Sequence, residues 1–161
     1  MIRGRILDGH NGIAGEWGHA PLPWPNADEY PGHACWCGRR ACLETYVSGT
    51  AFVRDYQEAT GRKLTGDKIA EAARAGEPEA SAALDRYVDR LGRGLAMISD
   101  VLDPDVIVLA GGMSNTAELY ERVPEVIARW VFSDVYRTRV VKAAHGDSSG
   151  VRGAAWLWPL E

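Results

Sequence analysis

All three cysteines of this 161-residue chain lie within eight positions, and this clustering constrains how the surrounding segment can fold. They are Cys35, Cys37 and Cys42. An odd number of thiols cannot pair off completely, and the Cys-x-Cys pair is too close in sequence for an easy disulfide. We therefore interpret the three sulfurs as metal ligands, and Zn²⁺ as the metal they suit. A closed structural zinc site has four protein ligands, so a histidine is expected to complete the set.

Two histidines are candidates for the fourth ligand. His33 forms a His-x-Cys-x-Cys pattern with the first two cysteines, and in an extended chain these three side chains would share one side. His19 lies further upstream, at the end of a Glu-Trp-Gly-His segment. The number and type of ligands alone leave both histidines open.

The segment around these residues resembles the ROK family of sugar kinases and related transcriptional repressors. That family has a Glu-x-Gly-His motif followed by Cys-x-Cys-Gly-x-x-Gly-Cys-x-Glu. This chain has Glu-Trp-Gly-His at 16–19 and Cys-Trp-Cys-Gly-Arg-Arg-Ala-Cys-Leu-Glu at 35–44. The resemblance implies a zinc site made of His19, Cys35, Cys37 and Cys42. Ala41 stands where the family usually has glycine, so a left-handed backbone at this turn would be strained.

The same resemblance implies a sugar site beside the metal. Glu16 and Glu44 flank the proposed ligands, and carboxylates are strong acceptors for the vicinal hydroxyl groups of a sugar. The family pattern also implies that His19 contacts the sugar through its second ring nitrogen. Zinc is then expected to be structural: it would orient the sugar site without activating a water molecule.

Composition favours a globular protein that does not bind nucleic acid. The chain has 46% hydrophobic residues, 22 acidic and 18 basic residues, and a net charge of −4. No run of Lys or Arg could neutralise a row of phosphates. We expect one domain over 1–161, with the zinc-binding insertion at 19–42. The longest apolar run, 106–110, is too short to span a membrane, and reduced cysteines favour the cytoplasm.

Sequence patterns predict a mixed α/β protein. The resemblance implies the C-terminal domain of an actin-like, ribonuclease H-like ATPase, truncated at its N-terminal side, with a mixed sheet covered by helices on both faces. Gly92 and Gly94 interrupt the longest helical pattern, and we expect them to admit a closely packed neighbour. The expected strands are 3–7, 105–110 (buried on both faces) and 139–143. The expected helices are 45–60, 67–75, 78–102, 117–131 and 150–158, and 21–31 is expected to be an irregular polar loop.

Gly111 and Gly112 form a second candidate site. They follow the predicted strand at 105–110 and precede a predicted helix, an arrangement that lets a nucleotide approach the backbone closely. The resemblance implies that the pair lines the adenosine side of the ATP cleft. It is not a P-loop, because the chain contains no Gly-Lys-Ser or Gly-Lys-Thr.

Family kinases also have an Asp-x-Gly-Gly-Thr phosphate loop and a general-base aspartate, and neither motif occurs in these 161 residues. The chain aligns with the C-terminal half of a family member. We therefore expect a fragment that contains no catalytic residue and is inactive alone, with ATP and Mg²⁺ acting only in the complete enzyme.

Within the family, the segments 15–24, 102–109 and 145–159 resemble bacterial fructokinases. This implies ATP-dependent phosphorylation of fructose to fructose 6-phosphate when the enzyme is complete. The alternatives are the sugar-sensing domain of a ROK repressor and a structural zinc or dimerisation module. We expect a small-molecule sugar ligand and a homodimer. Its interface would use an exposed sheet edge and the apolar residues Trp130, Val131, Phe132, Trp156 and Trp158.

Overall fold

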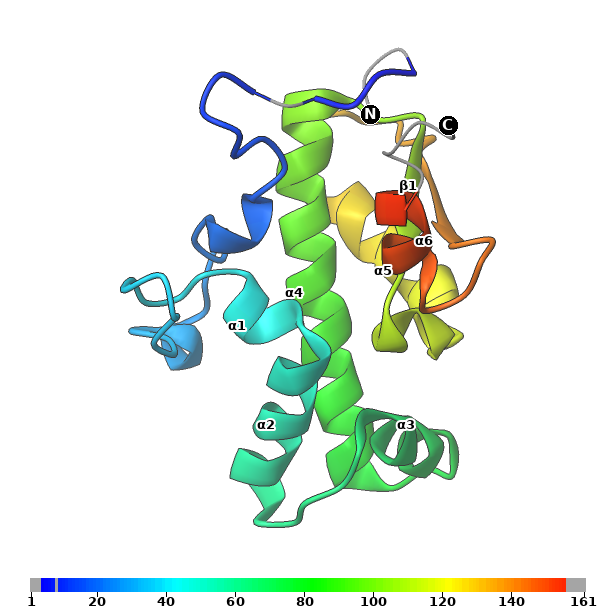
Figure 1. The fold of residues 1–161 in the computed structure, drawn as a ribbon. Helices are drawn as coiled ribbons and strands as arrows, with labels where there is room; N and C mark the ends of the chain where they lie inside the picture. Colours follow the sequence, from blue (N-terminus) through cyan, green and yellow to red (C-terminus); the bar gives the residue numbers. More distant parts are fainter. Residues whose placement is uncertain (1–3, 8, 156–161) are drawn as a thin grey trace.

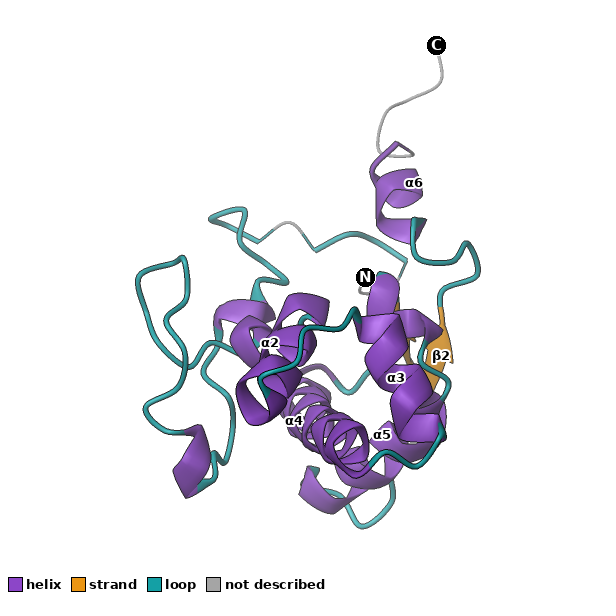
Figure 2. Cartoon of the chain, turned by 90° about the horizontal axis from the view of Figure 1, so that it is seen from below, coloured by secondary structure: helices purple, strands orange, loops and turns teal. Residues whose placement is uncertain are grey.

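The structure is a computed structural model that describes residues 4–7 and 9–155. One long helix, α4 (Pro78–Leu102), runs through its centre, and the other elements pack around it (Figure 1). Viewed along α4, the helices α2 and α5 lie on different sides of it (Figure 2). The other elements are η1 (Trp17–His19), η2 (Ala27–Glu29), α1 (Glu44–Val47), α2 (Gly49–Thr60), α3 (Gly66–Arg74), β1 (Val106–Leu109), η3 (Gly112–Asn115), α5 (Glu118–Trp130), β2 (Arg139–Lys142) and α6 (Ser149–Ala155).

Helix α4 has the bounds that its sequence predicts. Pro78 occupies the first turn, where its missing N–H costs no hydrogen bond. The helix ends at Asp103, which adopts a left-handed backbone (φ 43°) just before Pro104. Its apolar stripe provides much of the largest core cluster, which includes Ala83, Leu84, Tyr87, Val88, Leu91 and Leu95.

The two glycines of α4 allow close packing, as expected. A Cβ at Gly92 would overlap the side chain of Val126 on α5. A Cβ at Gly94 would lie 2.7 Å from Cδ2 of Leu43, which precedes α1. Helix α4 therefore packs closely against α5 at Gly92 and against the start of α1 at Gly94.

The single helix predicted over 45–60 is wrong, because the structure has two helices separated at Ser48. This residue adopts an extended backbone (ψ 160°), and its Oγ accepts a hydrogen bond from the N–H of Ala51 at 3.1 Å, so it caps α2. The hydroxyl of Tyr87 on α4 donates to the carbonyl of Val47 at 2.8 Å. At this break, the free N–H of Ala51 and the free carbonyl of Val47 are thus each bonded by a side chain.

The sheet is smaller than expected. In the described residues it has two parallel strands, β1 and β2, with Val106 paired to Arg139. The expected mixed sheet with helices on both faces is therefore not found in this part of the chain. Ile107 and Leu109 pack against the core, whereas Val106 and Val108 are exposed, so the strand is not buried on both faces.

The terminal elements also differ from expectation. Of the strand expected over 3–7, the described residues 4–7 form only an isolated bridge at Arg5, and Ile6 and Leu7 are exposed. Without core packing, two apolar residues at the end of a short polar segment do not specify a strand. Helix α6 matches the start of the predicted 150–158 helix, and Trp156 and Trp158 lie outside the described residues. No described helix combines the length and hydrophobicity needed to span a membrane.

Gly92→Ala should destabilise the protein. The added methyl group would overlap Val126 between α4 and α5, and overpacking of this kind costs about 1–3 kcal/mol. Gly153→Ala is the matched control, because a Cβ there meets nothing within 4 Å. Urea denaturation compares the two variants. Equal unfolding free energies would contradict the close α4–α5 contact.

Candidate metal centre and adjoining ligand sites

His19, Cys35, Cys37 and Cys42 form a compact cluster. One ligand atom from each residue lies within 4.8 Å of all the others. Nδ1 of His19 is 3.5 Å from Sγ of Cys35, and the Sγ atoms of Cys37 and Cys42 are 3.6 Å apart. One imidazole and three thiols at this spacing suit tetrahedral Zn²⁺, so the residues present fit a closed zinc site.

Short backbone pairings bring these residues together. His19 ends η1, and Cys42 directly precedes the turn into α1. An antiparallel bridge pairs Pro21 with Cys42, and the N–H of Cys35 donates to the carbonyl of Arg39 at 2.8 Å. Ala41 has φ +59°, the left-handed conformation in which a Cβ causes strain, as predicted. The turn before the last ligand therefore keeps the glycine conformation without a glycine.

His33 is not part of the cluster. Its Nε2 lies 3.6 Å from Oε2 of Glu58 on α2, and its ring centroid is 6.1 Å from that of Tyr46. The structure thus decides between the two histidines in favour of His19.

The two candidate sugar-binding carboxylates lie near different nitrogens of the His19 ring. Oε2 of Glu16 is 3.8 Å from Nε2 of His19, and its side chain is 67% exposed. Oε1 of Glu44 is 3.6 Å from Nδ1 of His19 and accepts a hydrogen bond from the Cys35 thiol at 2.9 Å. Nδ1 of His19 therefore faces Cys35 and Glu44, and Nε2 faces Glu16.

The cysteines differ in acidity. Burial raises the pKa of Cys35 to about 12, and its hydrogen bond to Glu44 adds to this effect. Burial also raises the pKa of Cys42. The backbone N–H of Arg39 lowers the pKa of Cys37 to about 7. Because thiolates are the metal-binding form, a metal ion would have to displace protons from Cys35 and Cys42.

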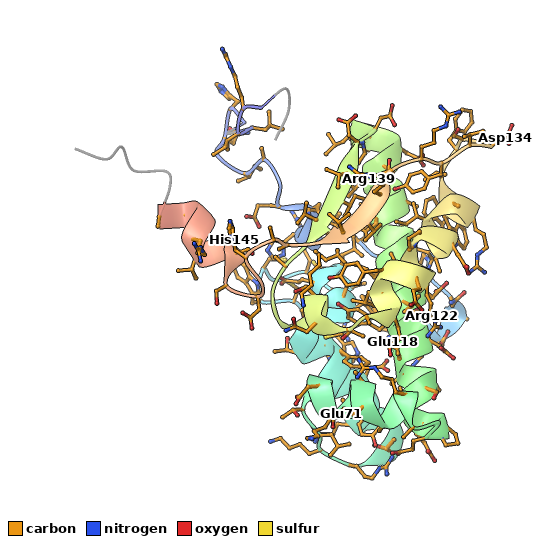
Figure 3. All side chains as sticks on the ribbon, turned by 90° about the vertical axis from the view of Figure 1, so that its right-hand side faces the viewer. Glu71, Glu118, Arg122, Asp134, Arg139 and His145 are labelled. Carbon is orange, nitrogen blue, oxygen red and sulfur yellow. The ribbon has the colours of Figure 1, made fainter. Side chains whose placement is uncertain are left out.

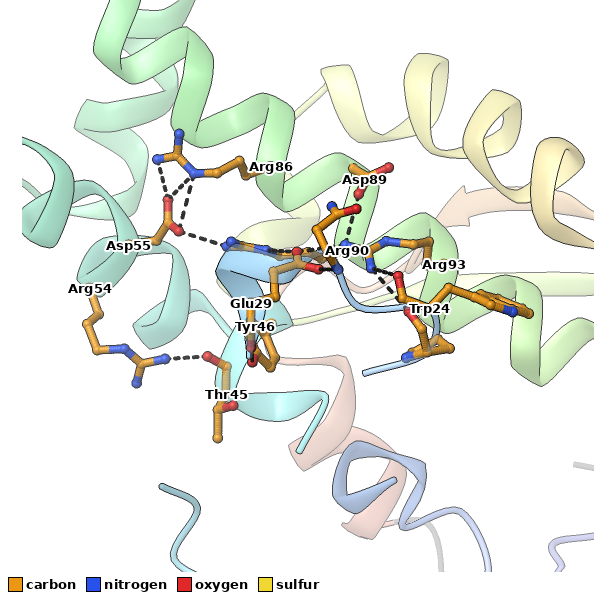
Figure 4. A network of polar contacts seen from close by, with 12 residues as sticks. Trp24, Glu29, Thr45, Tyr46, Arg54, Asp55, Arg86, Asp89, Arg90 and Arg93 are labelled. Carbon is orange, nitrogen blue, oxygen red and sulfur yellow. Dashed lines mark hydrogen bonds and ion pairs between the residues drawn. The ribbon is translucent and has the colours of Figure 1, made fainter. Parts of the chain in front are cut away.

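A buried ion network holds the loop over 21–31 against α4 (Figure 4). Oε1 of Glu29 accepts hydrogen bonds from Nε of Arg90 at 2.8 Å and from Nη2 of Arg93 at 2.7 Å. The side chains of Glu29 and Arg93 are only 3% and 1% exposed. Sequence reasoning missed this network, although basic residues at 86, 90 and 93 share a helix face with apolar neighbours.

The network extends to the loop backbone and to α2. Nη1 of Arg93 donates to the carbonyl of Trp24 at 2.7 Å, and the hydroxyl of Tyr46 donates to the carbonyl of Glu29 at 2.6 Å. Nη1 of Arg90 donates to Oδ1 of Asp55 at 2.7 Å. The loop that connects His19 to the cysteines therefore has one defined position, although its sequence predicts irregular structure.

A pocket of about 1050 Å³ lies between α2, α3 and the end of β1, and both Gly111 and Gly112 line it. Gly111 has φ 77° and ψ −180°, a conformation that only glycine adopts readily. A Cβ at Gly112 would meet nothing within 4 Å, so this backbone is open to a ligand. Beside the pocket, Nε of Arg74 on α3 donates to Oε1 of Glu118 on α5 at 2.6 Å. Glu118 and Glu71, which also lines the pocket, are both labelled in Figure 3.

The structure therefore brings the predicted glycine pair to the edge of a large pocket. The apolar part of the lining includes Val47, Val53, Leu64, Met113 and Leu119, and the polar part includes Thr50 and Asn115. A mostly apolar pocket with a few polar groups is typical of small-molecule sites. The sequence pattern indicated the glycines, and it did not indicate the contributions of α2 and α3.

Comparison with known proteins assigns the family. The model of the ROK family matches residues 1–161. The chain belongs to the ROK family. An N-acetyl-D-glucosamine kinase from Vibrio atlanticus (strain LGP32) is 39% identical over 161 residues, which are 98% of this chain and 53% of that protein. This ROK chain spans about half the length of the curated relatives it matches.

Two solved ROK structures share the fold. A ROK family glucokinase from Streptomyces griseus, solved with glucose and AMPPNP, is 29% identical with a TM-score of 0.80, over 95% of this chain and 54% of that one. A ROK family transcriptional regulator, a homolog of the E. coli MLC protein, is 26% identical with a TM-score of 0.69, over 86% and 37%. The expected ROK fold is confirmed. The fructokinase subgroup is not supported, because curated relatives at 39% identity are N-acetyl-D-glucosamine kinases.

Substitution of a cysteine should remove the metal. In Cys37→Ser, the set of four ligands is incomplete, and we expect the bound zinc to fall from one per chain to below half. His33→Ala should keep one zinc per chain, because His33 contacts Glu58 instead. Metal analysis of the dialysed proteins measures both. Loss of zinc in His33→Ala with retention in Cys37→Ser would contradict the assigned ligands.

Glu29→Ala should lower the free energy of unfolding by about 3 kcal/mol, because two buried guanidinium groups lose the buried carboxylate that they share and keep only Asp55 and the partly exposed Asp89 as acidic partners. Glu71→Ala is the control: its ion pair with Lys68 is exposed and should contribute less than about 1 kcal/mol. Denaturant titration of both variants at pH 7 measures the difference, and similar losses in the two would contradict a special role for the buried network.

The same network should make the free energy of unfolding depend on pH in the acidic range. Burial alone would raise the pKa of Glu29, but hydrogen bonds from Arg93 and Arg90 outweigh it and lower the pKa below the ordinary 4.5. The stabilisation is therefore complete above about pH 4.5 and is lost as the pH falls through the folded-state pKa. Glu29→Gln should lose stability less steeply than the parent chain below pH 4.5. Parallel pH profiles would count against this assignment.

Proposed function

We propose that this chain is the sugar- and adenosine-binding part of an ATP-dependent hexose kinase. The observation that carries the proposal is the orientation of His19. Its Nδ1 lies 3.5 Å from Sγ of Cys35 in the cysteine cluster, and its Nε2 faces the exposed carboxylate of Glu16. One imidazole can thus bind a structural metal and contribute to a sugar site.

The sugar would bind between Glu16, Glu44 and Nε2 of His19. The two carboxylates would accept hydrogen bonds from neighbouring hydroxyl groups, which sets the orientation of the ring. Zinc would be held by Nδ1 of His19 and by Cys35, Cys37 and Cys42. With four protein ligands it would have no open position, so it would orient the histidine and would not activate a substrate atom.

The nucleotide would bind in the pocket beside Gly111 and Gly112. The apolar lining from α2 and α3 suits a purine base, and the open backbone at Gly112 allows the ligand to approach closely. We assign no catalytic residue to this chain. The phosphate loop and the general base that the family resemblance implies are not among its 161 residues.

We propose N-acetylglucosamine as the first sugar to test, because curated relatives at 39% identity are N-acetyl-D-glucosamine kinases. Fructose, which segments of the sequence suggest, is the second. A sugar-sensing role is the alternative, favoured by the likeness to a ROK transcriptional regulator. A sensor would bind sugar and not nucleotide, and a structural zinc or dimerisation module would bind neither.

Calorimetric titration of the zinc-loaded chain tests these roles. Glu16→Gln should weaken binding of N-acetylglucosamine about tenfold, since a hydrogen bond to a charged group contributes about 1.5–3 kcal/mol. Gly112→Ala should weaken binding of AMPPNP about tenfold without lowering thermal stability, because its methyl group enters only the open pocket. Gly153→Ala is the control for both. Sugar binding without nucleotide binding would favour a sensor, and binding of neither ligand would overturn the kinase proposal.

A further inference from the structure

Two short elements connect the metal cluster to the large pocket. η1 begins with Trp17, which lines the pocket, and ends with His19, whose Nδ1 faces the cysteines. α1 begins with Glu44, which contacts the Cys35 thiol, and ends with Val47, which lines the pocket. Each element therefore has one end at the cluster and the other at the pocket.

Trp17 is the largest side chain in this connection. It is half-buried, and it packs against both hydrophobic clusters: the main core around α4, and a smaller one made of Leu22, Leu43 and Tyr46. Glu16, its neighbour in sequence, faces Nε2 of His19. The indole thus lines the candidate nucleotide pocket, directly follows a candidate sugar-binding residue in sequence, and packs against both clusters.

On the side of α4 the indole is closely packed. A Cβ at Gly94 of α4 would lie 3.5 Å from Cζ3 of Trp17 and 2.7 Å from Cδ2 of Leu43. The backbone of η1 is closed by hydrogen bonds from the N–H of His19 to Glu16 and from the N–H of Ala20 to Trp17, both 3.0 Å. In a close-packed interior, a shift of η1 that reorients Glu16 or His19 also moves the indole.

We propose that Trp17 is a positioning residue that couples sugar binding to nucleotide binding. Sugar held by Glu16, Glu44 and His19 would fix η1 and α1 together, and this would fix the pocket wall formed by Trp17 and Val47. A nucleotide that meets an already ordered wall binds more tightly. The proposal rests on the proposed function, because it needs both ligands to bind.

The coupling is measured by titrating AMPPNP into the zinc-loaded chain with and without saturating N-acetylglucosamine. We expect the sugar to tighten AMPPNP binding about fivefold or more, and AMPPNP to tighten sugar binding by the same factor. In Trp17→Leu this factor should fall to below about twofold, because leucine cannot reach both clusters. Trp17→Phe, which keeps an aromatic ring at the wall, should retain most of it.

Leu64→Ala is the matched control. Leu64 also lines the pocket, but it lies between α2 and α3, away from the cluster in sequence. It should weaken AMPPNP binding equally with and without sugar, and so leave the factor unchanged. Zinc content and circular dichroism of each variant report whether it is folded and metal-loaded. If Trp17→Leu fails these checks, Trp17→Met takes its place: it is also apolar and has no rigid ring, so the factor should again fall to below about twofold.

The outcomes separate the two proposals. Coupling in the parent chain that Trp17→Leu abolishes and Leu64→Ala preserves supports the role of Trp17. Binding of both ligands with no coupling, or with coupling that Trp17→Leu leaves intact, overturns this role and leaves the proposed function standing. If the parent chain binds neither ligand, both proposals are overturned.

Discussion

The ion pairs that Glu29 makes with Arg90 and Arg93 determine how the metal-binding region sits on the rest of the chain. The loop over 21–31 has four prolines, and Leu22 is its one buried apolar side chain, so apolar burial alone would hold it weakly. The two guanidinium groups extend from the central helix and bind its carboxylate and its backbone carbonyls. Because a buried charge is costly without its partner, the loop has little freedom to leave this position.

This attachment links the chemistry of the cysteines to the helical framework. The His19 ring faces sulfur on one side and a carboxylate on the other, and both neighbours come from segments adjoining the anchored loop. A site assembled from loops needs such support, because loops are otherwise the most mobile part of a fold. Helix α4 holds the loop through the ion pairs of Arg90 and Arg93 with Glu29, whereas it packs against the other helices largely through apolar side chains.

Much of this arrangement could be predicted from the sequence. The ligand set followed from the motif around residues 16–44, and the limits of α4 followed from Pro78 and Pro104. The break at Ser48 could not be predicted. An apolar recurrence continues across it, and the bond from Tyr87 to the carbonyl of Val47, which supports the break, joins residues 40 positions apart. The one-sided burial of β1 depends on which elements cover it, and a β-branched run does not encode that. The ion network was missed because it joins residues more than sixty positions apart, a separation over which no local pattern operates.

The contact between Gly92 and Val126 also makes these two positions depend on one another. A methyl group on α4 needs the volume that a branched side chain on α5 now fills, so a smaller residue at 126 would make room for it. Effects of substitution at the two positions should therefore not add, and the double variant should be better tolerated than the sum of its parts. Divergence at this helix pair is expected to proceed by compensating changes, with each position restricting which residues the other can accept.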